Sequence, residues 1–285
     1  MILIADSGST KTDWRLVNET GEVAHYKTIG FNPYFINSGN ILSELTNSDL
    51  VAINEKVTQV YFYAAGCSTE KNKQELQDPL NTFFCNAKVD VEHDMLAAAR
   101  ATCGKEKGVV AILGTGSNSC LYDGKEITEN VRALGYLLGD NGSGADIGTT
   151  FIKAYLGGEL PPEIEKAFKD ESGLSIDDIL DATYKQALPN RFLASFSLFV
   201  FKNIDDPIIY KMVTERFELF FENNICKYSD YQNNTLHLIG SVAFIYQDVF
   251  KAVAEKYNVN VGKVIKQPIE ELVKYHLEFS LEEGR

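Results

Sequence analysis

Two glycine-rich turns carry residue types that could bind an anion. The first follows the apolar start of the chain and reads Asp6-Ser7-Gly8-Ser9-Thr10-Lys11. The second reads Gly114-Thr115-Gly116-Ser117-Asn118 and also stands between two apolar stretches. Glycine lets the backbone approach an anion closely, and Ser and Thr hydroxyls add hydrogen-bond donors. Each turn is therefore able to cradle a phosphate without a net positive charge.

The two turns superpose by hand at an offset of 108 residues, which places Asp6 on Gly114 and Thr10 on Asn118. An internal repeat of this kind indicates two domains of similar topology. We expect the two turns to hold one polyphosphate from both sides. Neither is a Walker motif, because G-x-x-x-x-G-K-[ST] is absent and neither turn is expected to lead into a helix. Either turn alone can be read as an ordinary glycine-rich β-turn, whereas two in register form a stronger signal.

The elements that position the first turn are predicted from hydrophobic periodicity and turn residues. Strands at 2–5, 13–17 and 23–29 form an antiparallel meander whose second turn lies at 18–22. They are followed by a helix at 41–50, a strand at 57–64, a helix at 71–84, a strand at 88–91 and a helix at 95–103.

The charged tract CGKEKG at 103–108 is the expected domain boundary, and the strand pattern restarts after it. Strands are predicted at 109–113, 117–122, 125–127, 235–239 and 259–265, and helices at 144–156, 176–187, 193–201, 208–228, 242–257 and 269–279. The sequence thus predicts an α/β protein with domains at 1–106 and 107–285. The last helix could return to the first domain.

Composition restricts the classes of partner and the compartment. With 27 basic and 40 acidic residues the net charge is −13, which argues against nucleic acid or anionic lipid as a partner. The five cysteines are odd in number and include no CxxC pair, so neither a disulfide framework nor a zinc site is indicated. No basic segment precedes Asp6 and no apolar run approaches ~18 residues, so we expect a cytoplasmic protein without a signal peptide or membrane span.

Three motifs together resemble the sugar kinase, heat-shock protein 70 and actin superfamily, and within it the N-acetylglucosamine kinase branch of the BadF/BadG/BcrA/BcrD ATPase family. DSGSTKT at 6–12 resembles the first phosphate motif, GTGSN at 114–118 the second, and LIGSVAF at 238–244 the adenosine motif. The resemblance covers nearly the whole chain. It implies two ribonuclease-H-like, actin-like ATPase domains with an ATP and Mg²⁺ cleft between them. It also implies ATP-dependent phosphorylation of a hexosamine, with the 6-hydroxyl of N-acetylglucosamine as the expected acceptor.

The resemblance also implies roles for individual residues. Asp6 would hold Mg²⁺ through water, and Asp94 in VEHDMLAAARAT would accept the proton of the sugar hydroxyl as it attacks the γ-phosphate. The plainer interpretations are a turn-initiating Asp for Asp6 and a helix N-cap for Asp94. We expect no catalytic role for His93. The implied ATP contacts are Gly8, Ser9, Thr10, Lys11, Thr115, Gly116 and Ser117 for the phosphates, with Gly240 and Ser241 for the adenosine.

The same resemblance implies a sugar-binding set made of amides, carboxylates and a glycine. Its members are Asn32, Gly66, Asp94, Asn118 and Asp140. The segment at 140–142 can also be read as an ordinary turn leading into a helix. One departure from the glucosamine-type kinases is the pair Ala133-Leu134 where they carry Gly-Trp, which weakens the assignment of the sugar. Trp14 is expected in the core.

Three alternatives stay open at this point. Members of the family also act as ATPase activators of dehydratases and reductases, with an iron–sulfur cluster bridging a dimer. The cysteines lack a cluster spacing, although Cys103 and Cys120 lie near the start of the second domain. A kinase for another amino sugar and a non-enzymatic nucleotide switch are the others. We expect ATP and a small sugar as partners, no nucleic acid or membrane, and a homodimer as a candidate assembly.

Overall fold

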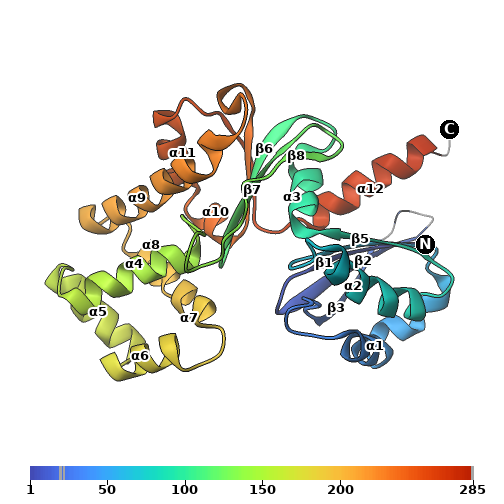
Figure 1. Ribbon diagram of the computed structural model, residues 1–285, viewed down its shortest axis with the longest axis horizontal. Helices are drawn as coiled ribbons and strands as arrows, with labels where there is room; N and C mark the ends of the chain where they lie inside the picture. Colours follow the sequence, from blue (N-terminus) through green and yellow to red (C-terminus); the bar gives the residue numbers. More distant parts are fainter. Residues whose placement is uncertain (19–20, 22, 284–285) are drawn as a thin grey trace. The chain divides into compact units, whose positions relative to one another are not determined.

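The computed structural model describes residues 1–18, 21 and 23–283, which fold into two compact units (Figure 1). Unit 1 comprises Met1–Gly104 together with Pro268–Arg285, and unit 2 comprises Lys105–Gln267. The turn expected at 18–22 lies mostly outside the described residues. The C-terminal helix α12 (Ile269–Glu283) thus belongs to the same unit as the first strand.

Unit 1 is built on a mixed sheet with the strand order β3-β2-β1-β4-β5. Strands β1 (Ile2–Ser7), β2 (Lys11–Val17) and β3 (Val23–Ile29) form the predicted antiparallel meander. Strands β4 (Gln59–Ala64) and β5 (Lys88–His93) continue the sheet parallel to β1.

Helices cover both faces of this sheet. Helices α1 (Ser38–Thr46) and α2 (Glu70–Phe83) pack on each other, and α3 (Asp94–Cys103) packs on α12. Short 3₁₀ turns lie at Asp49–Ala52 and Asn54–Lys56. The core contains Trp14, which is fully buried among Phe31, Phe62 and Phe84, so its predicted core position is confirmed.

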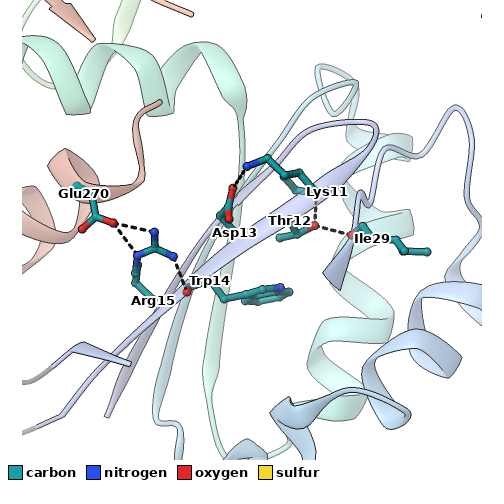
Figure 2. A network of polar contacts seen from close by, with 8 residues as sticks. Lys11, Thr12, Asp13, Trp14, Arg15, Ile29 and Glu270 are labelled. Carbon is teal, nitrogen blue, oxygen red and sulfur yellow. Dashed lines mark hydrogen bonds and ion pairs between the residues drawn. The ribbon is translucent and has the colours of Figure 1, made fainter. Parts of the chain in front are cut away.

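Two polar contacts hold α12 in unit 1. The buried guanidinium of Arg15 on β2 donates to Glu270 at the start of α12, with an Nε–Oε1 distance of 2.8 Å (Figure 2). The ring of His276 lies 2.8 Å from the Tyr63 hydroxyl, which also accepts from Arg100. Burial and the Arg100 charge lower the pKa of His276 to about 3, so this ring stays neutral.

Unit 2 repeats the sheet topology of unit 1. Its strands are β6 (Gly108–Leu113), β7 (Ser117–Tyr122), β8 (Ile127–Glu129), β9 (Leu236–Ile239) and β10 (Val261–Ile265). Their order is β10-β9-β6-β7-β8. Strand β7 is antiparallel to both β6 and β8, whereas β9 and β10 run parallel to β6. Reading from β1 and from β6 therefore gives the same arrangement, and the predicted α/β class with two similar sheets is confirmed.

The helices of unit 2 gather around a phenylalanine-rich core that includes Phe151, Phe168, Phe217 and Phe250. They are α4 (Gly144–Gly157), α5 (Pro162–Ser172), α6 (Ile176–Tyr184), α7 (Pro189–Ser195), α8 (Ser197–Lys202), α9 (Pro207–Asn223), α10 (Ser241–Ile245) and α11 (Gln247–Lys256), with 3₁₀ turns at Ile225–Lys227 and Tyr231–Asn233. Helix α5 was not predicted, and the single helix expected at 242–257 is wrong because the chain divides into α10 and α11 at Tyr246. Across the described part of the chain, no helix has the length and apolar character that crossing a membrane requires.

Candidate active site

Three strand ends lie level at one edge of the unit 1 sheet. Ser7, the last residue of β1, is in register with Ala64 of β4, and Ala64 is in register with His93 of β5. The carboxyl ends of parallel strands meet at one edge of a sheet, where open α/β sheets bind ligands. The residues that follow, Gly8 and Asp94 among them, therefore emerge at this common edge.

Hydrogen bonds within the first glycine turn and at its flanking residues fix its position. Gly8 N donates to Lys11 O at 3.0 Å, which closes the turn between β1 and β2. Thr12 Oγ1 lies 2.8 Å from Ser7 Oγ. It donates a hydrogen bond to the Ile29 carbonyl at 2.8 Å (Figure 2). Gly8, Thr10 and Lys11 are exposed, while Ser7 and Thr12 are buried. The hydroxyls of Ser7 and Thr12 thus position the turn, and the exposed residues are available to a ligand.

The hand superposition of the two turns is wrong by two residues. Asp6 lies inside β1, opposite Asp13, and is not part of the turn. In unit 2 the strand ends at Leu113 and Gly114 opens the turn. Gly114 therefore corresponds to Gly8 rather than to Asp6, because strand alternation and strand ends, not the glycine spacing, set the equivalence.

Two carboxylates, Asp6 and Asp94, lie close enough at this edge to repel each other. Burial, followed by the Asp94 and Asp13 charges, raises the pKa of Asp6 to about 7, and Lys11 opposes this shift. Burial raises the pKa of Asp94 to about 6. Lys11 is itself paired with Asp13 at 2.5 Å (Figure 2). The edge is thus a site of negative charge that a cation would stabilise.

Asp94 is the first residue of α3, and His93 is the N-cap of this helix. His93 Nδ1 accepts a hydrogen bond from Leu96 N at 3.3 Å, which is the usual cap interaction. The carboxylate of Asp94 accepts from the Met95 backbone N–H, which partly offsets the effect of burial on its pKa. The interpretation of Asp94 as the N-cap is therefore wrong, because His93 occupies the cap position. The Asp94 carboxylate is nevertheless fixed at the start of the helix.

The donor set at this edge fits a Mg²⁺ ion held through water. Among the described residues, no group of three or more His, Cys, Asp or Glu side chains is arranged to hold a metal ion directly. The Asp6 carboxylate, with its raised pKa beside Asp94, can accept hydrogen bonds from waters on the ion, and a cation here relieves the repulsion between the two carboxylates. Such a set suits an ion whose own ligands are waters and phosphate oxygens.

The predicted sugar residues Asn32 and Gly66 lie beside the first turn. Asn32 Nδ2 donates to Ser9 Oγ at 2.7 Å, and Asn32 is buried. Gly66 has a φ of +80°, and a Cβ there would come within 2.4 Å of Asn32 Oδ1. Only glycine fits this position, so unit 1 brings Asn32, Gly66 and Ser9 together.

Gly30 is a site residue that the sequence did not reveal. A Cβ on Gly30 would lie 2.3 Å from the Gly8 carbonyl oxygen and 2.6 Å from Thr10 N. Because no real Cβ makes such contacts, the backbone of the first turn rests directly on Gly30. The only sequence signal was a glycine immediately after a strand, in GFNPYF.

In unit 2, Asp140 packs against the second turn. A Cβ on Gly116 would lie 2.6 Å from Asp140 Oδ2, so a side chain there would displace the Asp140 carboxylate. Burial raises the pKa of Asp140, and a hydrogen bond from the Ser117 N–H opposes this shift. Ser117 Oγ donates to the Asn141 carbonyl at 2.9 Å. The hydroxyl and the amide of Ser117 therefore hold the segment at 140–141 in place.

The start of α4 is attached to the same turn. Gly144 N donates to Gly114 O at 2.8 Å, and Ala145 N donates to Thr115 O at 3.1 Å. Gly240, with φ +120°, packs on Leu113 O at the end of the neighbouring strand. Ser241 follows it and is exposed at the start of α10. The second turn and the expected adenosine residues thus share one edge of the unit 2 sheet.

The structure ties Asn118 and Leu134 less directly to the other predicted site residues than it ties Asp140. Asn118 Oδ1 accepts from Ser119 N at 2.9 Å and from Asn130 Nδ2 at 3.2 Å, so its oxygen is engaged within unit 2. Leu134, which stands where the resemblance expects Trp, is 54% exposed. Cys103 lies in α3 of unit 1, whereas Cys120 lies in β7 of unit 2.

The family is identified by a match over most of the chain. The model of the BadF/BadG/BcrA/BcrD ATPase family matches residues 5–202. The chain belongs to this family. This member of the BadF/BadG/BcrA/BcrD ATPase family is similar to the N-acetylmuramic acid/N-acetylglucosamine kinase of Clostridium acetobutylicum, with 26% identity over 208 residues, which cover 67% of this chain and 67% of the relative.

Two solved structures have the same fold as this family member. A Porphyromonas gingivalis protein with the suggested name N-acetylglucosamine kinase aligns with a TM-score of 0.92 and 42% identity, covering 98% of this chain and 99% of that chain. A ROK family glucokinase from Streptomyces griseus, solved with glucose and AMPPNP, shares the fold at 14% identity and a TM-score of 0.58, with coverage of 96% and 97%. The family and the sugar kinase fold predicted from the sequence are confirmed.

Proposed function

We propose that this protein is an ATP-dependent kinase that transfers the γ-phosphate of ATP to the 6-hydroxyl of N-acetylglucosamine. The names of the relatives from Clostridium acetobutylicum and Porphyromonas gingivalis support the reaction and the class of sugar. The observation that carries the proposal is the pair Asp6 and Asp94 at the level strand ends of unit 1, beside the exposed glycine turn.

Asp94 has the properties of the general base. The Met95 N–H fixes its carboxylate, and burial raises its pKa to about 6, close enough to neutral pH for proton transfer yet ionised at pH 7 and above. As the sugar O6 forms its bond to the γ-phosphorus, the bond from that phosphorus to the β,γ-bridging oxygen breaks and ADP leaves. The O6 proton passes to Asp94.

Residues of the two glycine turns would bind the phosphates of ATP. Gly8, Ser9, Thr10 and Lys11 line the first turn, and Thr115 and Gly116 line the second. Ser117 would act by holding the 140–141 segment, because its hydroxyl and amide are engaged there. Bound Mg²⁺, held by Asp6 through water, would neutralise charge on the phosphate oxygens. Gly240 and Ser241 would contact the adenosine.

The sugar residues are proposed from their hydrogen-bonding capacity. An Asn side chain has two N–H donors and two acceptor lone pairs. Asn32 uses one donor on Ser9 and one lone pair on the Tyr34 N–H, so it retains one of each for a sugar hydroxyl. Asp140, Asn118 and Gly66 complete the proposed set with Asp94. We place the reaction in the cytoplasm, where ATP is available, with a homodimer as the proposed assembly and no role for nucleic acid or membranes.

The proposal is tested by measuring ADP release with ATP, Mg²⁺ and a panel of sugars. We expect turnover with N-acetylglucosamine and a product whose phosphate lies on O6 by ³¹P–¹H NMR. Turnover with another amino sugar alone would keep the kinase and change its substrate. ATP hydrolysis that no sugar accelerates, together with a visible iron–sulfur absorption after anaerobic purification, would favour the ATPase activator instead.

A further inference from the structure

The loop after β3 presents an aromatic side chain from a turn closed by several hydrogen bonds. The Asn32 carbonyl accepts from Phe35 N at 2.8 Å and from Ile36 N at 3.1 Å. The Asn32 side chain accepts from Tyr34 N at 3.0 Å, which forms an Asx turn. Pro33 fixes its own φ within this turn. The backbone of Tyr34 is therefore pre-organised by the residue proposed to bind the sugar.

The Tyr34 ring lies beside the Asn32 amide on a shared support. A Cβ on Gly66 would come within 2.4 Å of Asn32 Oδ1 and 2.9 Å of Tyr34 Cδ2. Both side chains thus rest on the α-carbon of Gly66, whose carbonyl in turn accepts from Asn72 Nδ2 at 2.8 Å. A ring edge and an amide are held side by side by one glycine.

Tyr34 is nevertheless 67% exposed, so most of its ring is available. The neighbouring Phe35, 63% exposed, lines a pocket of about 500 Å³ that Ser9, Thr10 and Gly30 also line. Tyr34 does not line this pocket. Within the described residues, the exposed part of the Tyr34 ring has no partner.

We propose that Tyr34 determines sugar specificity by packing its ring against the apolar C–H face of the pyranose whose hydroxyl Asn32 binds. A pyranose presents C–H groups on its faces and hydroxyls at its rim, so it requires an apolar surface beside a donor and acceptor pair. An aromatic ring with an adjacent amide meets both requirements. Because the turn is pre-organised, little conformational entropy is lost when the sugar binds. This inference rests on the proposed function.

The test compares Tyr34→Ala with Tyr34→Phe and with Tyr210→Ala. Tyr210, near the start of α9, is 43% exposed and provides a matched tyrosine away from the residues proposed to bind the sugar. We measure KM for N-acetylglucosamine and for ATP, kcat, the melting temperature, and direct binding of N-acetylglucosamine by calorimetry. Tyr34→Leu is the second variant if the alanine variant does not fold, because it keeps apolar bulk and removes the aromatic face.

We expect Tyr34→Ala to raise the sugar KM and Kd about tenfold while the ATP KM and kcat change less than twofold. Tyr34→Phe should restore the wild-type sugar KM, since the ring and not the hydroxyl makes the contact, and Tyr210→Ala should have no effect. An unchanged sugar KM in Tyr34→Ala, a parallel rise in both KM values, or failure of Tyr34→Phe to rescue would overturn the inference and leave the kinase assignment intact. A wild-type protein that neither binds nor phosphorylates an amino sugar would overturn both.

Discussion

The α-carbon of Gly30 lies directly against the carbonyl of Gly8. A Cβ atom at Gly30 would stand 2.3 Å from the Gly8 oxygen and 2.5 Å from the Ser9 carbonyl carbon. These are backbone atoms, which cannot move aside as a flexible side chain can. The position of the first glycine turn therefore depends on the absence of a side chain at a residue that follows β3.

Replacing Gly30 by Ala should thus impair ATP use without unfolding the protein. The turn must shift by an appreciable fraction of an ångström, and a misplacement of about 1 Å in a catalytic site can lower kcat/KM by about 100-fold. We expect kcat/KM for ATP to fall by one to two orders of magnitude on this basis. Steady-state kinetics and a melting curve on the same preparation check this.

Gly39→Ala is the matched control. Gly39 lies in α1, and a Cβ there would meet only Asn37 Oδ1 at an ordinary 3.5 Å. Alanine is favoured over glycine inside helices, so this variant should be at least as stable as wild type and equally active. Wild-type kinetics in Gly30→Ala would remove the first turn from the ATP site.

Local patterns in the sequence predicted the sheets and the residues that follow them, but not contacts made across the fold. Asp94 could be found because it follows a strand and starts an Ala-rich helix. Gly30 could not, because its importance arises from the packing of β3 against a turn far away in sequence. The same limit explains the wrong superposition at an offset of 108, since the register with Asp13 shows that Asp6 belongs to β1.

The helical errors have a similar origin. Helix α5 buries only Ile164 and Phe168, so it offers too few apolar residues to be marked as a helix by its sequence. Its stability comes from packing of Phe168 against Phe151, Tyr155 and Phe199, which no local pattern reports. The hydrophobic run at 242–257 conceals the break at Tyr246, whose hydroxyl bonds to the Ser197 carbonyl.

Asp94→Asn should separate catalysis from folding. The amide keeps the shape of the side chain but lacks the basicity, so kcat should fall by roughly two to four orders of magnitude. The melting temperature should stay within a few degrees of wild type, and ATP and sugar should still bind. Kinetics, calorimetry and a melting curve measure these quantities.

His93→Ala provides the opposite pattern and serves as the comparison. Loss of the His93 cap on Leu96 N should cost about 1 kcal/mol of stability while most of kcat is retained. If Asp94→Asn keeps near-normal turnover, or if His93→Ala loses as much kcat as Asp94→Asn, the general base must be sought elsewhere.

The pH dependence of turnover follows from the direction of the Asp94 shift. Burial raises its pKa to about 6, and the base works only when ionised. At saturating Mg²⁺ we expect kcat/KM for the sugar to be level above pH 7 and to fall about tenfold per pH unit below pH 6. A pH profile from 5 to 9 measures this limb, and its absence would contradict a carboxylate base.

The affinity for Mg²⁺ should vary over a different range of pH. Burial and the neighbouring Asp94 raise the pKa of Asp6 to about 7, so protons compete with the cation at this carboxylate below neutral pH. The apparent Mg²⁺ constant in the presence of ATP should weaken as pH falls from 8 to 6, beyond what ATP protonation explains. Asp6→Asn should abolish that excess pH dependence. Identical profiles for the wild-type protein and this variant would exclude Asp6 from the metal site.

Asp6→Asn should also stabilise the metal-free protein while it damages activity. Because the folded-state pKa of Asp6 is raised from 3.8 to about 7, the native state binds the proton more tightly than the unfolded chain. Stability therefore falls as pH rises from about 4 to 7, and the full cost is present above pH 7. Asparagine carries no charge and does not repel Asp94, so the variant should melt a few degrees above wild type at pH 8 in EDTA, with the difference vanishing near pH 4.

Mg²⁺-dependent turnover of the same variant should drop at least tenfold, since a hard cation prefers a charged oxygen. A variant that melts below wild type at pH 8 would mean that the Asp6 carboxylate stabilises the fold. The argument that its charge lowers stability while it supports metal binding would then be wrong.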